Sequence, residues 1–415
     1  MLRVNFKARI AAAGAEALQG VEEGDRIKFS VMARKQRLDL TLFIAIVCCI
    51  GGGLLEKNDV GVSAAPCYPA LFVFGDSLSD TGNGNLSGNN FFTRTAQRPY
   101  GETVPGQPFT RFSDGLLLVD FLATRIGLPL SKPYLNRSAD FSTGANYAVS
   151  GATAQNASYL RSKLITPLTN ISLDVQIDWH LTLKQMAQSP NTPSNSSFEN
   201  GLYVLEIGGY DYISALTSLL YTPSYVTTNF IPLVIAKIKN ATEVLYANGA
   251  RDFLYIGVTP LGCSPSLLAT FLLGAKDSNG CLSDINTLAY NHELSLSNLV
   301  NQLRLDYTDA TFTFLDYYAA YNKVIGNSSS YGFSNTLETC CGAGPAFPYR
   351  YNQLLFCNTL SSTLFSTLCP NPNTFINWDG INFTHKFNSV IFNMTINAES
   401  NLYPPNAFST CMPSL

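Results

Sequence analysis

Four short apolar runs recur along the chain, and each is followed by Gly, Pro, Asp or Asn. They lie at residues 70–74, 202–207, 253–258 and 312–315. Each run is continuously apolar rather than alternating, which is typical of a strand covered on both faces of a parallel sheet. We therefore predict four parallel strands.

Helical patterns separate these runs. Apolar residues recur at helical spacing from Phe230 to Leu245, and Asn248-Gly249 then stops the pattern. A second pattern covers residues 116–126, and we expect Ser113-Asp114 to cap it. Strands that alternate with helices predict a doubly wound α/β sheet, whose ligands bind beyond the carboxyl ends of the strands.

An apolar run near the N-terminus, residues 40–55, has the order of a secretory signal. Arg34, Lys35 and Arg37 precede it, and the small residues 62–65 follow it. Cleavage is expected after Ala64, because Pro66 would hinder cleavage after Ala65. The alternative is a retained membrane anchor, but the run is short for a span of about 20 residues. We predict a signal and N-terminal extension over residues 1–64 and a single domain over residues 65–415.

The amino-acid composition and net charge argue against nucleic acid as a partner. Of 415 residues, 46% are hydrophobic and only 13% are charged, with a net charge of −3. The folded part has no basic stretch, so it lacks the clustered positive charge with which proteins bind the phosphates of nucleic acids. We expect a monomer that binds no nucleic acid and has no stable membrane span.

The number of cysteines outside the predicted signal is consistent with a secreted protein. Two of the ten lie in the predicted signal, and eight remain: Cys67, Cys263, Cys281, Cys340, Cys341, Cys357, Cys369 and Cys411. An even set in a secreted chain indicates four disulfides, with 105 pairings open. Cys263 and Cys281 bracket one short loop, so we expect them to pair, and residues 326–372 to form a stapled loop region. No Cys-x-x-Cys pair exists and the three histidines are scattered, so we expect no metal and no cofactor.

Sequons for N-glycosylation are frequent, which is typical of a glycoprotein. They begin at Asn85, Asn136, Asn156, Asn170, Asn195, Asn240, Asn327, Asn382 and Asn393.

The candidate reactive residue is expected directly after the first strand. Residues 71–83 run from a buried strand into Gly75-Asp76-Ser77 and a polar turn. A glycine allows a sharp bend, so that the Ser77 hydroxyl and its backbone N–H can both face a cleft. Gly-Asp-Ser alone could be a plain turn, but the longer string is far more specific.

That string resembles the nucleophile block of the plant-type GDSL esterases/lipases, which are secreted SGNH hydrolases. Further similar blocks follow in the family's order at residues 111–115, 144–152, 206–212, 261–265, 331–333, 340–342 and 378–384. The resemblance implies a flavodoxin-like three-layer α/β/α sandwich with a mostly parallel central sheet. It also implies hydrolysis of carboxylic esters and an extracellular location, in the cell wall or apoplast.

The resemblance assigns roles where the residues match. Ser77 corresponds to the nucleophile and one oxyanion donor, Gly151 to a second donor, and Asp379 to the carboxylate that orients the catalytic histidine. Two positions depart from the family's pattern. Tyr210 stands where the family has an oxyanion asparagine, and Asn382 stands where it has the histidine base. An asparagine has no titratable nitrogen and cannot take the serine proton.

Another histidine could supply the base. His180 and His292 are expected to be surface or core-edge residues within helices. His385 lies three residues after Asn382, where a helix is expected to begin, so it is the candidate substitute; the alternative is a capping or solvent-exposed histidine.

Three functions remain open. The chain could be an ester hydrolase that acts through Ser77, a relative that binds an ester, lipid or glycan without efficient turnover, or a structural protein. The intact Ser77 and Asp379 argue against the last. A group of apolar loop residues could line an acyl pocket, although the favoured interpretation is that they belong to the ordinary core: Phe91, Phe92, Leu267, Leu268, Phe271 and Leu272.

Overall fold

A six-stranded sheet organises the domain in a computed structural model of the chain. The structure describes residues 67–104, 106, 110–358, 367–409 and 411. All described residues belong to one unit, residues 64–415. The predicted signal at residues 1–64 lies outside the described residues, and the proposed division into signal and single domain stays a prediction.

The central sheet has the strand order β10-β5-β4-β3-β1-β2, and all neighbours are parallel except β10 and β5. Its strands are β1 (Leu71–Gly75), β2 (Gly144–Asn146), β3 (Leu202–Glu206), β4 (Asp252–Ile256), β5 (Thr311–Leu315) and β10 (Leu402–Tyr403). The order 2-1-3-4-5 of the parallel strands is that of flavodoxin-like folds, in which ligands bind at the switch point between β1 and β3. The predicted fold class is confirmed, and the four predicted strands are β1, β3, β4 and β5.

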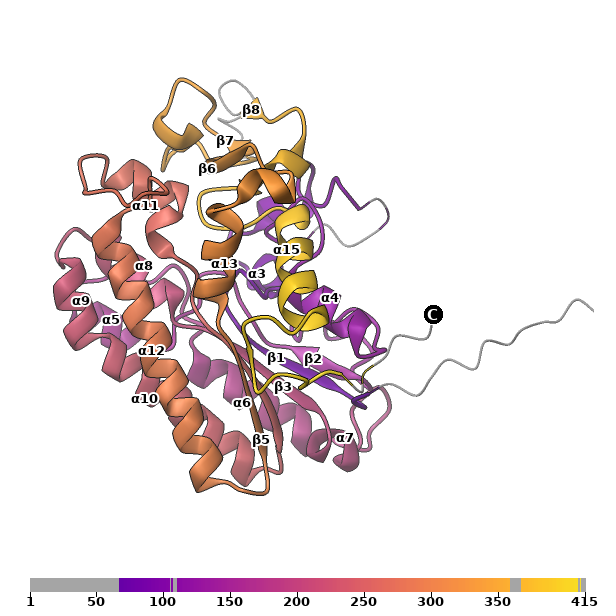
Figure 1. The fold of residues 1–415 in the computed structure, drawn as a ribbon. Coiled ribbons are helices and arrows are strands. Elements are labelled where there is room, and N and C mark those ends of the chain that lie inside the picture. Colours follow the sequence, from indigo (N-terminus) through magenta and orange to yellow (C-terminus); the bar gives the residue numbers. More distant parts are fainter. Residues whose placement is uncertain (1–66, 105, 107–109, 359–366, 410, 412–415) are drawn as a thin grey trace, which may run out of the picture. The chain divides into compact units, whose positions relative to one another are not determined.

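Helices cover both faces of this sheet (Figure 1). They are α3 (Asn83–Leu86), α4 (Leu118–Arg125), α5 (Ala157–Ser162), α6 (Leu173–Gln185), α7 (Asn195–Glu199), α8 (Gly209–Thr217), α9 (Pro223–Asn229), α10 (Ile231–Ala247), α11 (Pro265–Thr270), α12 (Ser283–Asp306), α13 (Tyr317–Ile325) and α15 (His385–Phe392). The predicted helix from Phe230 to the Asn248-Gly249 stop is α10.

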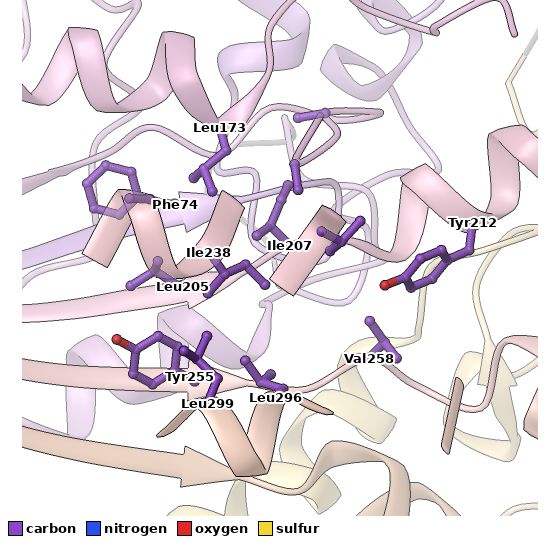
Figure 2. Packing of buried hydrophobic residues seen from close by; sticks show 14 of the residues in the cluster. Phe74, Leu173, Leu205, Ile207, Tyr212, Ile238, Tyr255, Val258, Leu296 and Leu299 are labelled. Carbon is purple, nitrogen blue, oxygen red and sulfur yellow. The ribbon is translucent and has the colours of Figure 1, made fainter. Parts of the chain in front are cut away.

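Successive residues of each strand enter opposite cores. Phe72 and Phe74 of β1 pack with α6, α10 and α12, whereas Leu71 and Val73 pack with α4, α13 and α15. Figure 2 shows part of the first core, where Phe74, Leu205 and Tyr255 from three strands meet side chains of these helices. Burial on both faces explains why the strands are continuously apolar in sequence.

The predicted cap at Ser113-Asp114 is wrong. Helix α4 begins at Leu118, and the Leu117 backbone N–H donates to the Asp120 carboxylate at 2.9 Å. Asp114 serves a different helix, because its carboxylate accepts the backbone N–H of His385, the first residue of α15, at 2.7 Å. The sequence pattern located the helix but could not show which helix N-terminus the carboxylate would reach.

All eight cysteines form disulfides, as expected: Cys67–Cys411, Cys263–Cys281, Cys340–Cys369 and Cys341–Cys357. The predicted Cys263–Cys281 pair is confirmed. The last two disulfides lie within the predicted stapled region, which also contains β6 (Asn335–Thr339), β7 (Cys341–Gly342) and β8 (Thr367–Leu368). β6 pairs with β9 (Phe375–Asn377), the strand that leads to the residues of the candidate site.

Candidate active site

Ser77 lies two residues beyond the end of β1, at the carboxyl edge of the sheet. β1 and β3 approach closely here, because a Cβ atom on Gly75 would lie 2.4 Å from the backbone oxygen of Glu206. Glycine is therefore needed where the strand gives way to the turn. Ser77 itself is fully buried, with 0% of its surface exposed.

Asp379 and Asn382 lie in the turn between β9 and α15. The Asp379 Oδ1 atom accepts the backbone N–H groups of Ile381 and Asn382 at 3.0 and 2.9 Å, which is an Asx-type turn. Thr384 then caps α15 by accepting the Phe387 N–H at 3.2 Å. The local sequence thus holds the backbone of Asn382 through the Asp379 side chain.

A chain of hydrogen bonds joins the three residues. The Ser77 hydroxyl donates to Asn382 Oδ1 at 2.6 Å. Asn382 Nδ2 donates to both carboxylate oxygens of Asp379, at 2.9 and 3.0 Å. The Tyr100 hydroxyl also donates to Asp379 Oδ2, at 3.3 Å. The connectivity is that of a nucleophile, a base and an orienting carboxylate, with an amide in the place of an imidazole.

The direction of this chain is set by chemistry. A carboxylate only accepts hydrogen bonds, so the NH2 group of Asn382 must face Asp379, and its carbonyl oxygen must face Ser77. An amide oxygen accepts the serine hydrogen bond but does not take up the proton at neutral pH. The arrangement can therefore orient Ser77, but it cannot act as a general base.

Tyr210 lies against Ser77 at the start of α8. Burial raises the pKa of its phenol, and the neighbouring Ser77 side chain offsets only part of this rise. The phenol therefore stays protonated and is a donor, not a base. Tyr210 lines the main cavity of this region, together with Asp379 and Asn382, whereas Ser77 does not line it. We infer that the tyrosine ring lies between the nucleophile and the cavity.

Gly151 has the left-handed backbone conformation, with φ of +76°, and a Cβ there would clash with Leu168 at 2.8 Å. In the part of the chain that the structure describes, its N–H donates to no protein acceptor. A free N–H on a buried glycine is what an oxyanion donor requires. The expected role of Gly151 stays a prediction.

Two buried carboxylates position the segment around Gly151. Asp80 accepts the N–H and hydroxyl of Ser150 at 2.8 and 2.9 Å. Asp211 accepts the N–H groups of Ala154 and Gln155 at 2.7 and 3.0 Å. Sequence reasoning assigned no role to these residues, although both lie inside the blocks that carry the resemblance.

The residue before Ser77, Asp76, is a buried acid. Burial raises its pKa to about 7, and the hydrogen bond from the Leu78 N–H lowers the pKa by a smaller amount. Burial likewise raises the pKa of its neighbour Glu206 well above the usual range, and the charge of Asp76 adds to this rise. A like-charged buried pair holds at least one proton at neutral pH.

The structure does not bring any histidine to Ser77. His385 is half-buried, and its Nδ1 accepts the Leu116 N–H at 3.0 Å. The alternative expectation for His385, a capping or solvent-exposed histidine, is therefore not met either. His180 and His292 are 1% and 0% exposed, so their expected position at the surface or core edge is wrong. Their rings contact the hydroxyls of Tyr147 and Tyr212, and burial lowers the pKa of each histidine to about 3.

The cavity has a volume of about 370 Å³, within the range of small-molecule sites. Part of its wall is aromatic and consists of Phe91, Phe92, Phe112, Tyr210, Tyr351 and Phe356, and the rest is polar or aliphatic. Of the six residues considered for an acyl pocket, only Phe91 and Phe92 line it. Leu267 and Leu268 are fully buried in the core, Phe271 packs against the core, and Leu272 is exposed. Among the described residues, no group of three His, Cys, Asp or Glu side chains could hold a metal ion.

Comparison with known proteins identifies the family. The family model described as GDSL-like lipase/acylhydrolase matches residues 71–394. Acetylajmalan esterase 2 of Rauvolfia serpentina is 36% identical over 321 residues, which are 76% of this chain and 86% of that protein. A GDSL esterase/lipase of Arabidopsis thaliana is 37% identical over 330 residues, which are 76% of this chain and 87% of that protein. These relatives are carboxylic ester hydrolases by name. The chain therefore belongs to the GDSL-like lipase/acylhydrolase family.

Proposed function

We propose that the protein is a secreted ester hydrolase that acts on small-molecule carboxylic esters or lipids through Ser77. The observation that carries this proposal is the hydrogen-bond chain from Ser77 through Asn382 to Asp379. It links residues that are 305 positions apart in the sequence and aligns the serine hydroxyl as a nucleophile requires.

In the proposed reaction, Ser77 Oγ attacks the carbonyl carbon of the ester, and the alcohol leaves. Water then hydrolyses the acyl-serine and releases the acid. The N–H groups of Ser77 and Gly151 are the oxyanion donors, and the protonated Tyr210 hydroxyl is a third donor close to Ser77. Because Asn382 cannot take the serine proton, the proton passes to water, and we expect slow turnover. Loss of a triad base costs roughly 10⁴ to 10⁶ in turnover, which leaves about 10³ over the uncatalysed reaction.

A second candidate function is binding of an ester, lipid or glycan without efficient turnover. The specific observation that favours it is the burial of Ser77, which has 0% exposure and does not line the cavity. In this case the aromatic cavity is the binding site, and Ser77 serves only to hold Asn382 in place.

Turnover of para-nitrophenyl acetate by the purified protein, compared with Ser77→Ala, decides between the two. A Ser77-dependent rate, at least roughly tenfold above that of the variant, supports the hydrolase. Equal rates in both proteins would show that Ser77 is not a nucleophile and would favour the binding function. The name of the Rauvolfia relative states that it acts on acetylajmalan, which supports an acetyl ester as the first probe.

Secretion is supported by the four disulfides and the basic-apolar-small order of residues 34–65. No helix within the described ranges is long and apolar enough to cross a bilayer. N-terminal sequencing of protein recovered from the medium is expected to begin near Ala65. Recovery only from membranes, with residues 40–55 retained, would contradict the signal prediction.

A further inference from the structure

One cation in the wall of the cavity, Arg94, has two nitrogen atoms that meet no hydrogen-bond acceptor in the described part of the chain. Arg94 belongs to a short 3-10 helix, Thr93–Ala96, and lines the cavity together with Tyr210, Asp379 and Asn382. Its Nε and Nη1 atoms are buried and, within the described part of the chain, have no hydrogen-bond partner. A buried charge without a counter-ion is costly, and it is stabilised by any anion that enters the same low-dielectric space.

Aromatic rings hold the guanidinium in place. Its central carbon lies 3.9 Å from the ring centroid of Phe91 and 4.7 Å from that of Phe356. A cation-π contact uses none of the N–H groups of the guanidinium, so these groups stay available for an acceptor. The backbone of Arg94 is also held, because its carbonyl accepts a 2.9 Å hydrogen bond from Asn358.

The acid that lines the same cavity, Asp379, is already engaged. The Asp379 carboxylate accepts hydrogen bonds from Asn382, Ile381 and Tyr100. Both groups act on Tyr100: its hydroxyl donates to Asp379, burial raises its pKa, and the Arg94 guanidinium offsets part of that rise. Arg94 is therefore close to the proposed catalytic residues without being neutralised by them.

We propose that Arg94 binds an anionic group of the ligand, so that the natural ligand is an ester carrying a free carboxylate. This rests on the proposed function in that it assigns a substrate class to the same cavity. A single carboxylate fits better than a dianionic phosphate, because Asp379 lines the same cavity and repels added negative charge. The aromatic wall takes the apolar part of the ligand, and Arg94 fixes its charged end.

The test measures binding rather than turnover, in Ser77→Ala protein that cannot form an acyl-enzyme. The probes are monobenzyl esters of succinic, glutaric and adipic acid, each compared with the benzyl ester that has a terminal methyl group in place of the carboxylate. We expect at least one carboxylate probe to bind roughly tenfold tighter than its methyl counterpart, as a charged hydrogen bond provides. Calorimetric or NMR titration gives the two dissociation constants.

Two arginine variants test whether Arg94 causes the tighter binding of the carboxylate probes. Arg94→Met keeps length and apolar contact but removes the charge, and is expected to abolish the preference. Arg137 provides a matched control, since it is an exposed arginine 4.4 Å from the ring of Tyr134 that does not line the cavity. Arg137→Met should keep the preference. If Arg94→Met does not fold, Arg94→Lys and the probe comparison in Ser77→Ala alone still decide the question.

The outcomes separate the two proposals. Equal binding of the paired probes, absence of binding by all carboxylate probes, or an unchanged preference in Arg94→Met would overturn the inference and identify Arg94 as a support of the aromatic wall. If this occurs while para-nitrophenyl acetate is still turned over by Ser77, the proposed function stands alone. If carboxylate probes bind more tightly but turnover does not depend on Ser77, the anion site is supported and the protein is a binding protein rather than a hydrolase.

Discussion

The hydroxyl of Ser77 donates a 2.6 Å hydrogen bond to the side-chain oxygen of Asn382, whose NH2 group is held by both oxygens of Asp379. The geometry of a catalytic triad is therefore present while the proton acceptor is absent. Restoring a proton acceptor at position 382 is therefore a direct test of the proposed function.

Asn382→His is predicted to raise the hydrolysis of para-nitrophenyl acetate roughly tenfold or more, because an imidazole can take the Ser77 proton. Asn382 lines the cavity, so the larger ring has space on that side. The rate of the variant should also gain a dependence on pH around 6.5, where a histidine titrates. The gain must disappear in Ser77→Ala/Asn382→His. An unchanged rate in Asn382→His would mean that another group already supplies the base or that the site has diverged beyond repair.

Tyr210→Asn is predicted to expose Ser77, since Tyr210 is close to Ser77 and lines the cavity, whereas Ser77 does not. The measurement is mass-spectrometric labelling of Ser77 by a fluorophosphonate, which reacts with accessible nucleophilic serines. In the Asn382→His background, the new amide should raise turnover further by supplying an oxyanion donor worth about 3 kcal/mol. Tyr210→Phe is the matched control, because it keeps the ring and should leave Ser77 shielded. Equal labelling of all three proteins would refute the shielding role.

The sequon at Asn382 is predicted to carry no glycan. Asn382 is 4% exposed, and its Nδ2 atom, to which a sugar would be attached, donates to Asp379. Asn195 and Asn327 are exposed and should be modified. Glycopeptide mass spectrometry of the secreted protein gives the occupancy of each site. Substantial occupancy at Asn382 would exclude an intact esterase pocket and favour a binding or structural role.

The contribution of Asp76 and Asp211 to the stability of the fold is predicted to fall as the pH rises from about 4 to about 7. Buried His180 and His292, with pKa values of about 3, contribute in the opposite direction up to about pH 6.5, so a variant is needed to isolate the aspartate contribution. Burial raises the pKa of Asp76 and of Asp211 from 3.8 to about 7, so both are neutral in the folded protein at low pH. Their unfolded forms release protons at lower pH, which favours unfolding as the pH increases through this window. Each group contributes a slope of at most about 1.4 kcal/mol per pH unit.

Thermal unfolding measured across this pH window tests the prediction. Asp76→Asn keeps an oxygen for the 3.1 Å hydrogen bond from the Leu78 N–H but removes the titration, so its stability should fall less, or rise more, with pH than that of the wild type. An identical pH slope of the melting temperature in Asp76→Asn and in the wild type would show that Asp76 does not titrate as proposed.

Local patterns in the sequence were enough to predict much of this protein. Continuous apolar runs identified four strands of the parallel sheet, because residues buried on both faces leave no room for alternation. The short loop between Cys263 and Cys281 identified their disulfide, and the ordered blocks identified the family. The identities of residues 210 and 382 alone raised the question of catalytic competence, since the chemistry of a side chain does not depend on the fold.

Only the tertiary structure decided how those side chains meet. The direction of the Asn382 amide follows from its contacts with Asp379 and Ser77, and the latter contact joins segments 305 residues apart. The contact of His385 with Leu116, the burial of Ser77 and the place of Arg94 in the cavity wall also depend on distant segments. Side-chain periodicity and propensity report on neighbours along the chain, whereas burial, charge pairing and hydrogen-bond direction are set by neighbours in space.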